Sequence, residues 1–247
     1  MLEREVYTLF EGRAFRCSKN STFCGDPCLT MHKVGFYEAE DDIPYDIQVV
    51  RDAVKRLYAE YDLLGENPCY RFDLMHLTRQ CNADYGWVMV RKMEKAYTEK
   101  NLPEFEALSR EYLDLIDLQD RLLSNSERTM LGPWLQRAWD TGRTEREKRM
   151  FLHAAKDLIT LWCGINGKYS LSHYSTREWS GLLGGYHKNC WDAYLSMLMI
   201  YIDKPQEIHE IDWTEYSYVF SLSNERYPVT PGNTLREDVE RSMEAWK

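Results

Sequence analysis

The sequence has 247 residues, of which 44% are hydrophobic and 29% are charged, and its formal net charge is −9. This composition suits a soluble globular chain with one large domain or two small ones. The acidic balance argues against nucleic-acid binding, because phosphate groups require a concentrated basic surface. No apolar run approaches the roughly 18 residues of a membrane-spanning helix, so we expect no membrane segment.

The first residues carry no recognisable targeting signal. Glu3 and Glu5 stand where a secretory signal peptide is positively charged, and no long apolar stretch follows. An exported parent protein would carry its signal outside this sequence, so the compartment stays open.

Apolar residues recur along most of the chain at three- and four-residue spacing, which is typical of helices with one buried face. The first stripe follows Asp42, Ile43 and Pro44, where we expect a helix to begin because proline suits a first turn. Pro68 breaks the chain, and a longer stripe then runs to Tyr97. These segments predict two successive helices.

Later helices are marked at their ends. Pro103 opens one, and Gly132 with Pro133 opens a short one that Gly142 is expected to end in a left-handed conformation. Three pairs have the spacing of a capping box, namely Thr144 with Glu147, Ser175 with Glu178, and Asp212 with Glu215. Behind the first box, the spacing predicts one buried face made of Phe151, Ala154, Leu158 and Trp162.

No segment shows the two-residue alternation of a half-buried strand, so we predict an all-α fold. Residues 41–247 are expected to form a single compact multi-helix domain, because no linker or repeat divides them. Residues 1–40 differ from the rest of the chain in composition. They are predicted to be a loop-rich, cysteine-containing connector at the N-terminus.

An aspartate-rich stretch at Asp41, Asp42 and Asp46 resembles the diphosphate-binding motif of helical terpenoid synthases. That chemistry requires carboxylates on one face of a continuing helix, to hold Mg²⁺. Pro44 instead places the first two aspartates at or before a helix start, where acids act as caps. We therefore favour a capping role.

The cysteines give no strong site. Cys17, Cys24, Cys28 and His32 lack the paired short spacing of zinc ligands, so a disulfide or free thiols is the better interpretation. Cys69, Cys81, Cys163 and Cys190 fall in or beside helical patterns and suit buried thiols. We predict no metal and no cofactor, and no disulfide pairing is assigned.

No catalytic constellation is visible. His153, His173 and His187 are scattered, and neither a zinc-protease motif nor a nucleophile elbow occurs. A hydrolytic pair needs one buried carboxyl group beside an ionised one, and no glutamate lies in an apolar loop. The sequence predicts no catalytic residue in this chain.

The loop of residues 162–174 has more promise for binding. It lies between two predicted helices, contains glycines, and is bounded by Trp162 and Tyr174. Such rings stack on the apolar C–H faces of sugars while their polar tips bond hydroxyl groups. Composition alone favours the alternative, in which both rings pack the joint between helices.

Four ordered motifs resemble one known family. They are FDL with LTRQ at residues 72–80, LGPWL at 131–135, the stretch around residues 161–182, and LSNERYP at 222–228. Together they are similar to the C-terminal helical domain of family 89 glycoside hydrolases, the α-N-acetylglucosaminidases. The resemblance covers nearly the whole chain.

The resemblance implies a function that the spacing of residues does not indicate. Family members remove terminal α-linked N-acetylglucosamine with retention, using two glutamates on a (β/α)₈ barrel that precedes the helical domain. The matching positions imply that Trp162, Tyr174 and Leu171 line the sugar pocket, while Arg79 and Arg177 are structural ion-pair residues. A free-standing, non-catalytic sugar-binding or protein-interaction module is the alternative. The family occurs in lysosomes and is also exported, and a cytoplasmic form is compatible with the cysteines.

Overall fold

The computed structural model describes residues 43, 45–162, 177–208 and 211–247. Within these ranges the chain is helical, and the only strand-like pairing is an isolated bridge between Met130 and Ser180. This confirms the all-α prediction. The α-helices are α3 (Ile47–Ala59), α4 (Tyr61–Leu64), α5 (Pro68–Thr98), α6 (Leu102–Leu123), α7 (Leu131–Thr141), α8 (Glu145–Asp157), α9 (Lys188–Ile200), α10 (Trp213–Leu222) and α11 (Leu235–Ala245).

Short polar side chains begin several of these helices. The carboxylate of Asp46 accepts a hydrogen bond from Gln48 N, and Asn67 caps α5 immediately before Pro68. The box of Thr144 and Glu147 is present in full at the start of α8. Asp212 caps α10 by accepting from the backbone of Thr214 and Glu215. Each cap supplies a partner for N–H groups that the first helical turn leaves unbonded.

Two predicted helix ends were wrong. The first helix begins at Ile47 rather than at residues 42–44, because Asp46 has an extended backbone and its carboxylate caps the first turn. Gly142 has φ −76° and ψ 138°, so it ends α7 in an extended rather than a left-handed conformation. A Cβ on Gly142 would lie 2.5 Å from Lys148 N, so close approach of α8 explains the glycine.

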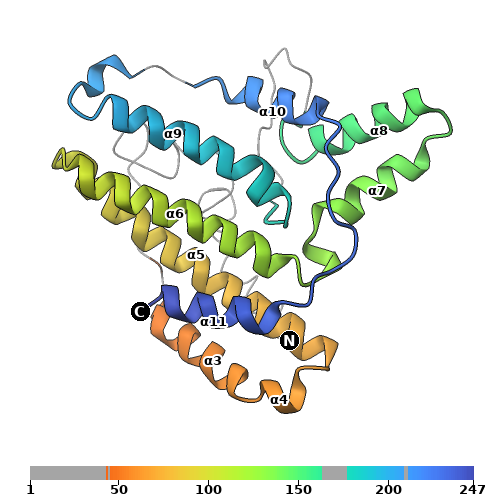
Figure 1. Cartoon of the computed structure of the whole chain (residues 1–247), viewed down its shortest axis with the longest axis horizontal. Coiled ribbons are helices and arrows are strands. Elements are labelled where there is room, and N and C mark those ends of the chain that lie inside the picture. Colours follow the sequence, from red (N-terminus) through yellow and green to blue (C-terminus); the bar gives the residue numbers. More distant parts are fainter. Residues whose placement is uncertain (1–42, 44, 163–176, 209–210) are drawn as a thin grey trace.

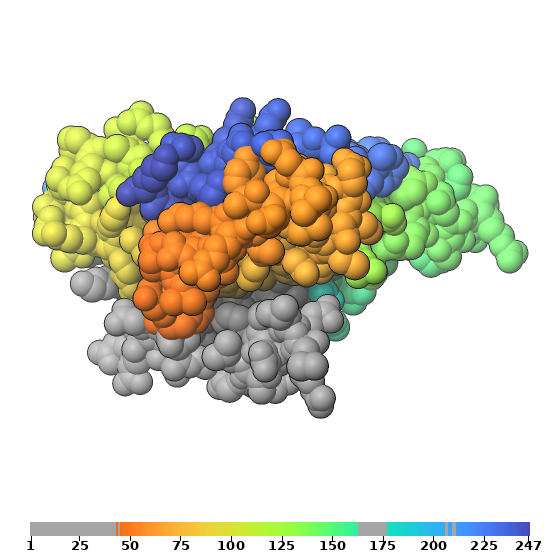
Figure 2. Space-filling view, turned by 90° about the horizontal axis from the view of Figure 1, so that it is seen from below, coloured from red at the N-terminus to blue at the C-terminus, as the bar shows by residue number. Residues whose placement is uncertain are grey.

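The long helices form layers. Helices α5 and α6 lie side by side, α9 packs on α6, and α11 crosses the pair on the side that carries α3 and α4 (Figure 1). Helices α7 and α8 form a hairpin that projects from one end of the molecule (Figures 1 and 2). Within the described residues, no helix combines the length and apolarity needed to cross a bilayer.

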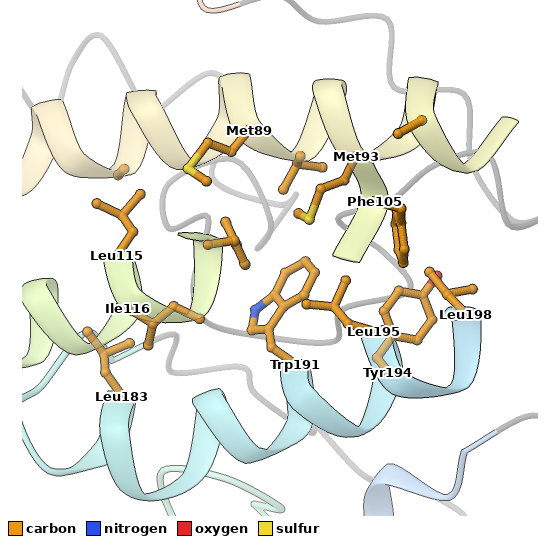
Figure 3. Packing of buried hydrophobic residues seen from close by; sticks show 14 of the residues in the cluster. Met89, Met93, Phe105, Leu115, Ile116, Leu183, Trp191, Tyr194, Leu195 and Leu198 are labelled. Atoms are coloured by element: carbon orange, nitrogen blue, oxygen red, sulfur yellow. The ribbon is translucent and has the colours of Figure 1, made fainter. Parts of the chain in front are cut away.

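The main core lies between α5, α6 and α9. Its largest member is Trp191, which meets Tyr112 edge-on with ring centroids 4.7 Å apart. Figure 3 shows the surrounding side chains converging on the Trp191 ring from all three helices. The predicted buried stripe of α9 is confirmed, and its members are Trp191, Tyr194, Leu195 and Leu198.

The chain around Glu178 differs from the predicted capped helix. Residues 177–179 are not helical, and Ser180 pairs with Met130 before a π-helical turn at Leu183–His187. Gly184 and Gly185 lie inside that turn, which leads directly into α9. Ser175 lies outside the described residues. Glu178 therefore does not cap a helix that begins three residues before it.

The predicted buried face of α8 was also wrong. Leu152, Ala155 and, in the turn after the helix, Ile159 are buried, whereas Ala154 and Leu158 are exposed. The true inner face is displaced by one residue from the predicted stripe. Both faces of this helix carry apolar residues, so periodicity alone selected the wrong one.

Candidate functional site

Trp162 is the first residue of the predicted sugar-binding loop and follows the turn that ends α8. Its backbone has φ 55°, a left-handed conformation that non-glycine residues rarely adopt. Trp162 N donates to Asp157 O over 2.7 Å, and 37% of the residue's surface is exposed. Unfavourable backbone angles persist only where the surroundings impose them, and they concentrate at functional sites.

Three buried residues fix the turn before Trp162. Ile159, Thr160 and Leu161 are each at most 5% exposed. Thr160 Oγ1 donates to Lys156 O over 2.8 Å, which ties the turn back to the last turn of α8. Buried side chains and a hydrogen bond therefore hold the backbone that leads into Trp162.

Lys156 holds the C-terminal end of α8 against the end of α10. Its side chain is fully buried, and Nζ donates to Ser223 O and Ser223 Oγ, both over 2.7 Å. The ammonium group also lies 5.0 Å from the centroid of the Phe220 ring and 5.9 Å from that of Tyr227. These contacts clamp α8 to the end of α10.

The charge of Lys156 makes stability depend on pH. Burial lowers the pKa of Lys156 to about 8, whereas nearby Glu225 acts in the opposite direction. The unfolded chain keeps the ordinary pKa of about 10.4, so between these values it binds more protons than the folded chain. The cost of the buried charge is fully present below pH 8 and is relieved as the pH rises towards 10.4.

We therefore expect the free energy of unfolding of the wild type to rise by about 2 kcal/mol, relative to Lys156→Met, between pH 7.5 and pH 10. Comparing urea unfolding of the two proteins at both pH values isolates this residue from the tyrosines that also titrate. A difference that stays constant with pH would contradict the lowered pKa.

An ion pair between Arg79 and Glu178 lies beyond the C-terminal end of the loop. Arg79 NH1 donates to Glu178 Oε2 over 2.7 Å, and Gln119 Nε2 donates to the same oxygen over 3.3 Å. The Glu178 side chain is only 4% exposed. Glu178 lies four residues after the loop of residues 162–174, so this pair fixes where the chain returns to the helical body.

A second buried carboxylate fixes the next turn. Asp120 Oδ1 accepts from Gly181 N over 2.7 Å and from Gly184 N over 2.8 Å. Burial raises the pKa of Asp120, and these backbone hydrogen bonds oppose that rise. Gly181 has φ 88°, which favours glycine. Asp120 thus positions the start of the π-helical turn.

Trp134 joins the two sides of the loop. Its indole Nε1 donates to Ala155 O over 3.1 Å, close to the end of α8. Its ring lies 5.8 Å from the ring of Trp179, which directly follows Glu178. One side chain of α7 therefore contacts both α8 near its end and the residue that follows Glu178.

The LSNERYP motif at residues 222–228 also packs against α7. A Cβ on Gly132 would lie 1.9 Å from Pro228 O, so the LGPWL and LSNERYP motifs are in direct backbone contact. The Tyr227 ring packs against Gly181 and Gly185. All four motifs that are distant in sequence thus meet at the anchors of one loop.

The three predicted pocket residues have different outcomes. The structure places Trp162 at an exposed loop end with the strained conformation described above, whereas Leu171 and Tyr174 lie outside the described residues. Arg79 is an ion-pair residue, as predicted. The guanidinium of Arg177 lies 5.5 Å from the centroid of the Trp179 ring.

Sequence reasoning missed Lys156, Asp120 and the burial of Glu178. Each is a charged residue in a helical or capping pattern, which is usually solvated. The glutamate was interpreted as the last residue of a capping box. No local pattern distinguishes these residues from surface charges.

The described residues contain no group of three or more histidine, cysteine or acidic side chains that could hold a metal ion. Cys81 and Cys190 are buried, as predicted, whereas Cys69 is exposed and Cys163 lies outside the described residues. The predicted cysteine loop, with Cys17, Cys24 and Cys28, lies outside the described residues.

Comparison with known proteins now gives the family. The family described as Alpha-N-acetylglucosaminidase (NAGLU) C-terminal domain matches residues 1–244. The chain belongs to this family. It is 27% identical over 241 residues to the human protein Alpha-N-acetylglucosaminidase, covering 95% of this chain and 31% of the human protein.

Solved structures agree with this membership of the α-N-acetylglucosaminidase C-terminal domain family. A family 89 glycoside hydrolase from Clostridium perfringens in complex with PUGNAc is 26% identical with a TM-score of 0.77, covering 83% of this chain and 24% of that chain. Another structure from the same organism, in complex with its substrate GlcNAc-alpha-1,4-galactose, shares the fold with a TM-score of 0.79 at 23% identity. It covers 94% of this chain and 29% of that chain. The chain thus spans less than a third of each of these relatives.

Proposed function

We propose that this chain is the C-terminal helical domain of a retaining exo-α-N-acetylglucosaminidase, and that it acts together with a (β/α)₈ catalytic domain. In this proposal the helical domain supplies one wall of the pocket for terminal α-linked N-acetylglucosamine. The catalytic carboxylates belong to the barrel. The family membership and the greater length of the relatives support this division.

One observation carries the pocket proposal. Trp162 is 37% exposed and has a left-handed backbone conformation, directly after three buried residues. A tryptophan that only filled a joint between helices would be enclosed, because burying its ring is worth several kcal/mol. An aromatic ring held rigidly at a surface suits stacking on a sugar face.

Tyr174 and Leu171 complete the proposed wall. Tyr174 would add a second ring and a hydroxyl donor, and Leu171 an apolar contact. The anchors at Lys156 and Glu178 support this arrangement, because they hold both ends of the intervening loop on one scaffold. Rigid anchors reduce the entropy lost when a loop binds a ligand.

An activity assay of the isolated chain tests whether catalysis belongs to a separate domain. We expect purified residues 1–247 to release no product from an aryl α-N-acetylglucosaminide, because retaining hydrolysis needs a general acid and a nucleophile that this chain does not supply. The complete gene product, assayed in parallel, is expected to turn over. Turnover by the isolated chain that disappears on replacing one of its own glutamates would refute the proposal. A gene with no barrel-encoding region would favour a free-standing binding module.

A further inference from the structure

Two buried carboxamides lie between the C-terminal helix and the segment that follows the loop of residues 162–174. Asn82 on α5 and Gln119 on α6 are both fully buried, and Asn82 Nδ2 donates to Gln119 Oε1 over 2.9 Å. We call these two residues the amide pair. A buried amide is costly unless its donors and its acceptor are satisfied, so the partners of the pair show what holds it.

On one side the amide pair contacts α11, which crosses α5 and α6 (Figure 1). Trp246, the residue that ends α11, donates its indole Nε1–H to Asn82 Oδ1 over 2.9 Å. Asn82 Nδ2 also donates to Ser242 Oγ over 3.1 Å. Helix α11 therefore supplies every partner of the Asn82 amide except Gln119.

On the other side the amide pair contacts the chain just after the loop. Gln119 Nε2 donates to Arg79 O over 3.1 Å and to Glu178 Oε2 over 3.3 Å. The next residue of α6, Asp120, accepts from two backbone N–H groups of the turn that follows Glu178. Two successive residues of α6 thus hold the segment in which the chain returns from the loop.

The two ends of this series of hydrogen bonds fix the orientation of both amides. An indole N–H can only donate, whereas a carboxylate and a backbone carbonyl can only accept. Asn82 therefore turns its oxygen to Trp246 and its NH2 group to Gln119. Gln119 in turn accepts from Asn82 and directs its own NH2 group to Glu178. If either amide turned over, two donors would face each other on one side of it and two acceptors on the other.

We propose that the amide pair couples α11 to the end of the loop, with Trp246, Asn82 and Gln119 as positioning residues for Glu178. Loss of the indole N–H leaves the Asn82 oxygen without its donor and allows that amide to turn over. Gln119 then loses the group that orients it, and its hydrogen bond to Glu178 weakens. Such networks carry coupling because their members have discrete alternative arrangements.

Trp246→Phe tests the coupling, because it keeps an aromatic ring and removes only the N–H and part of the indole. Hydrogen exchange of the complete protein, followed by mass spectrometry, reports local opening of the backbone. We expect the amides of residues 179–184 to exchange at least about threefold faster in this variant. Gln119→Met, which acts on Glu178 directly, should accelerate the same amides at least about tenfold. Residues 191–198, in the core of α9, should exchange as in the wild type.

Arg236→Met is the matched control. Arg236 also lies on α11, and its NH1 donates to Asp62 Oδ1 over 2.7 Å, so the variant removes a contact of the same helix outside the amide pair. We expect it to leave the exchange of residues 179–184 unchanged. Acceleration by Arg236→Met equal to that by Trp246→Phe would overturn the coupling through the amides.

The enzyme assay separates this coupling from the proposed function on which its effect on the sugar pocket rests. In the complete enzyme we expect Trp246→Phe to raise KM for an aryl α-N-acetylglucosaminide about twofold with kcat unchanged. Faster exchange of residues 179–184 with an unchanged KM would support the coupling and count against the pocket. Unchanged exchange of these residues, or equal acceleration of residues 191–198, would overturn the coupling whatever the value of KM.

Discussion

Replacing Arg79 by methionine is expected to lower the free energy of unfolding by about 3–5 kcal/mol, because a buried carboxylate loses its cation. Glu178 is only 4% exposed, and its Oε2 accepts from Arg79 NH1 over 2.7 Å. Among the described residues nothing donates a hydrogen bond to Oε1. The remaining donor to Oε2, Gln119 Nε2, is neutral and more distant at 3.3 Å. Chemical denaturation of the two proteins measures the loss.

A second substitution separates charge from packing. Adding Glu178→Gln to Arg79→Met removes the uncompensated charge, so we expect the double variant to recover most of the lost stability. If the double variant is as unstable as Arg79→Met alone, the effect comes from lost packing of the arginine stem, and the ion pair is not the anchor described here.

Gly132→Ala is expected to destabilise the domain by about 2–3 kcal/mol, because a Cβ there meets backbone and not a movable side chain. The added atom would lie 1.9 Å from Pro228 O and 2.8 Å from Tyr227 O. Gly132 lies inside α7, where alanine would otherwise favour the helix by about 1 kcal/mol. The sign of the change therefore shows whether steric conflict or helix propensity dominates.

Gly232→Ala is the matched control for Gly132→Ala. Its nearest obstacle is Ser124 Oγ at 3.3 Å, which belongs to a side chain that can rotate. We expect the unfolding temperature of this control to change little. An unchanged or raised unfolding temperature for Gly132→Ala would mean that the two motifs are not in the tight contact described here.

The interior of the fold was predictable from the sequence because it follows one period. Helix α9 presents Trp191, Tyr194, Leu195 and Leu198 to the core as predicted, at the three- and four-residue spacing of one helix face. The same reasoning predicted the wrong buried face for helix α8. With apolar residues on both faces, periodicity cannot tell which face meets the core of this domain.

The site was predictable only in part. Family motifs pointed to Trp162, but its left-handed backbone has no sequence signature. Glu178 had the spacing of a capping residue, and its true partner Arg79 lies 99 residues earlier in the chain. Lys156 has the charge of a typical surface residue, although it is fully buried. Contacts of this range arise from tertiary packing, which local patterns do not encode.

Trp162→Ala in the complete enzyme tests the central claim, that this helical domain supplies a wall of the sugar pocket. We expect KM for an aryl α-N-acetylglucosaminide to rise about tenfold, equivalent to about 1.4 kcal/mol of lost stacking, with the unfolding temperature unchanged. Trp162→Phe, which keeps a ring, should recover part of the affinity. An unchanged KM together with a lowered unfolding temperature would contradict the claim and make Trp162 a packing residue.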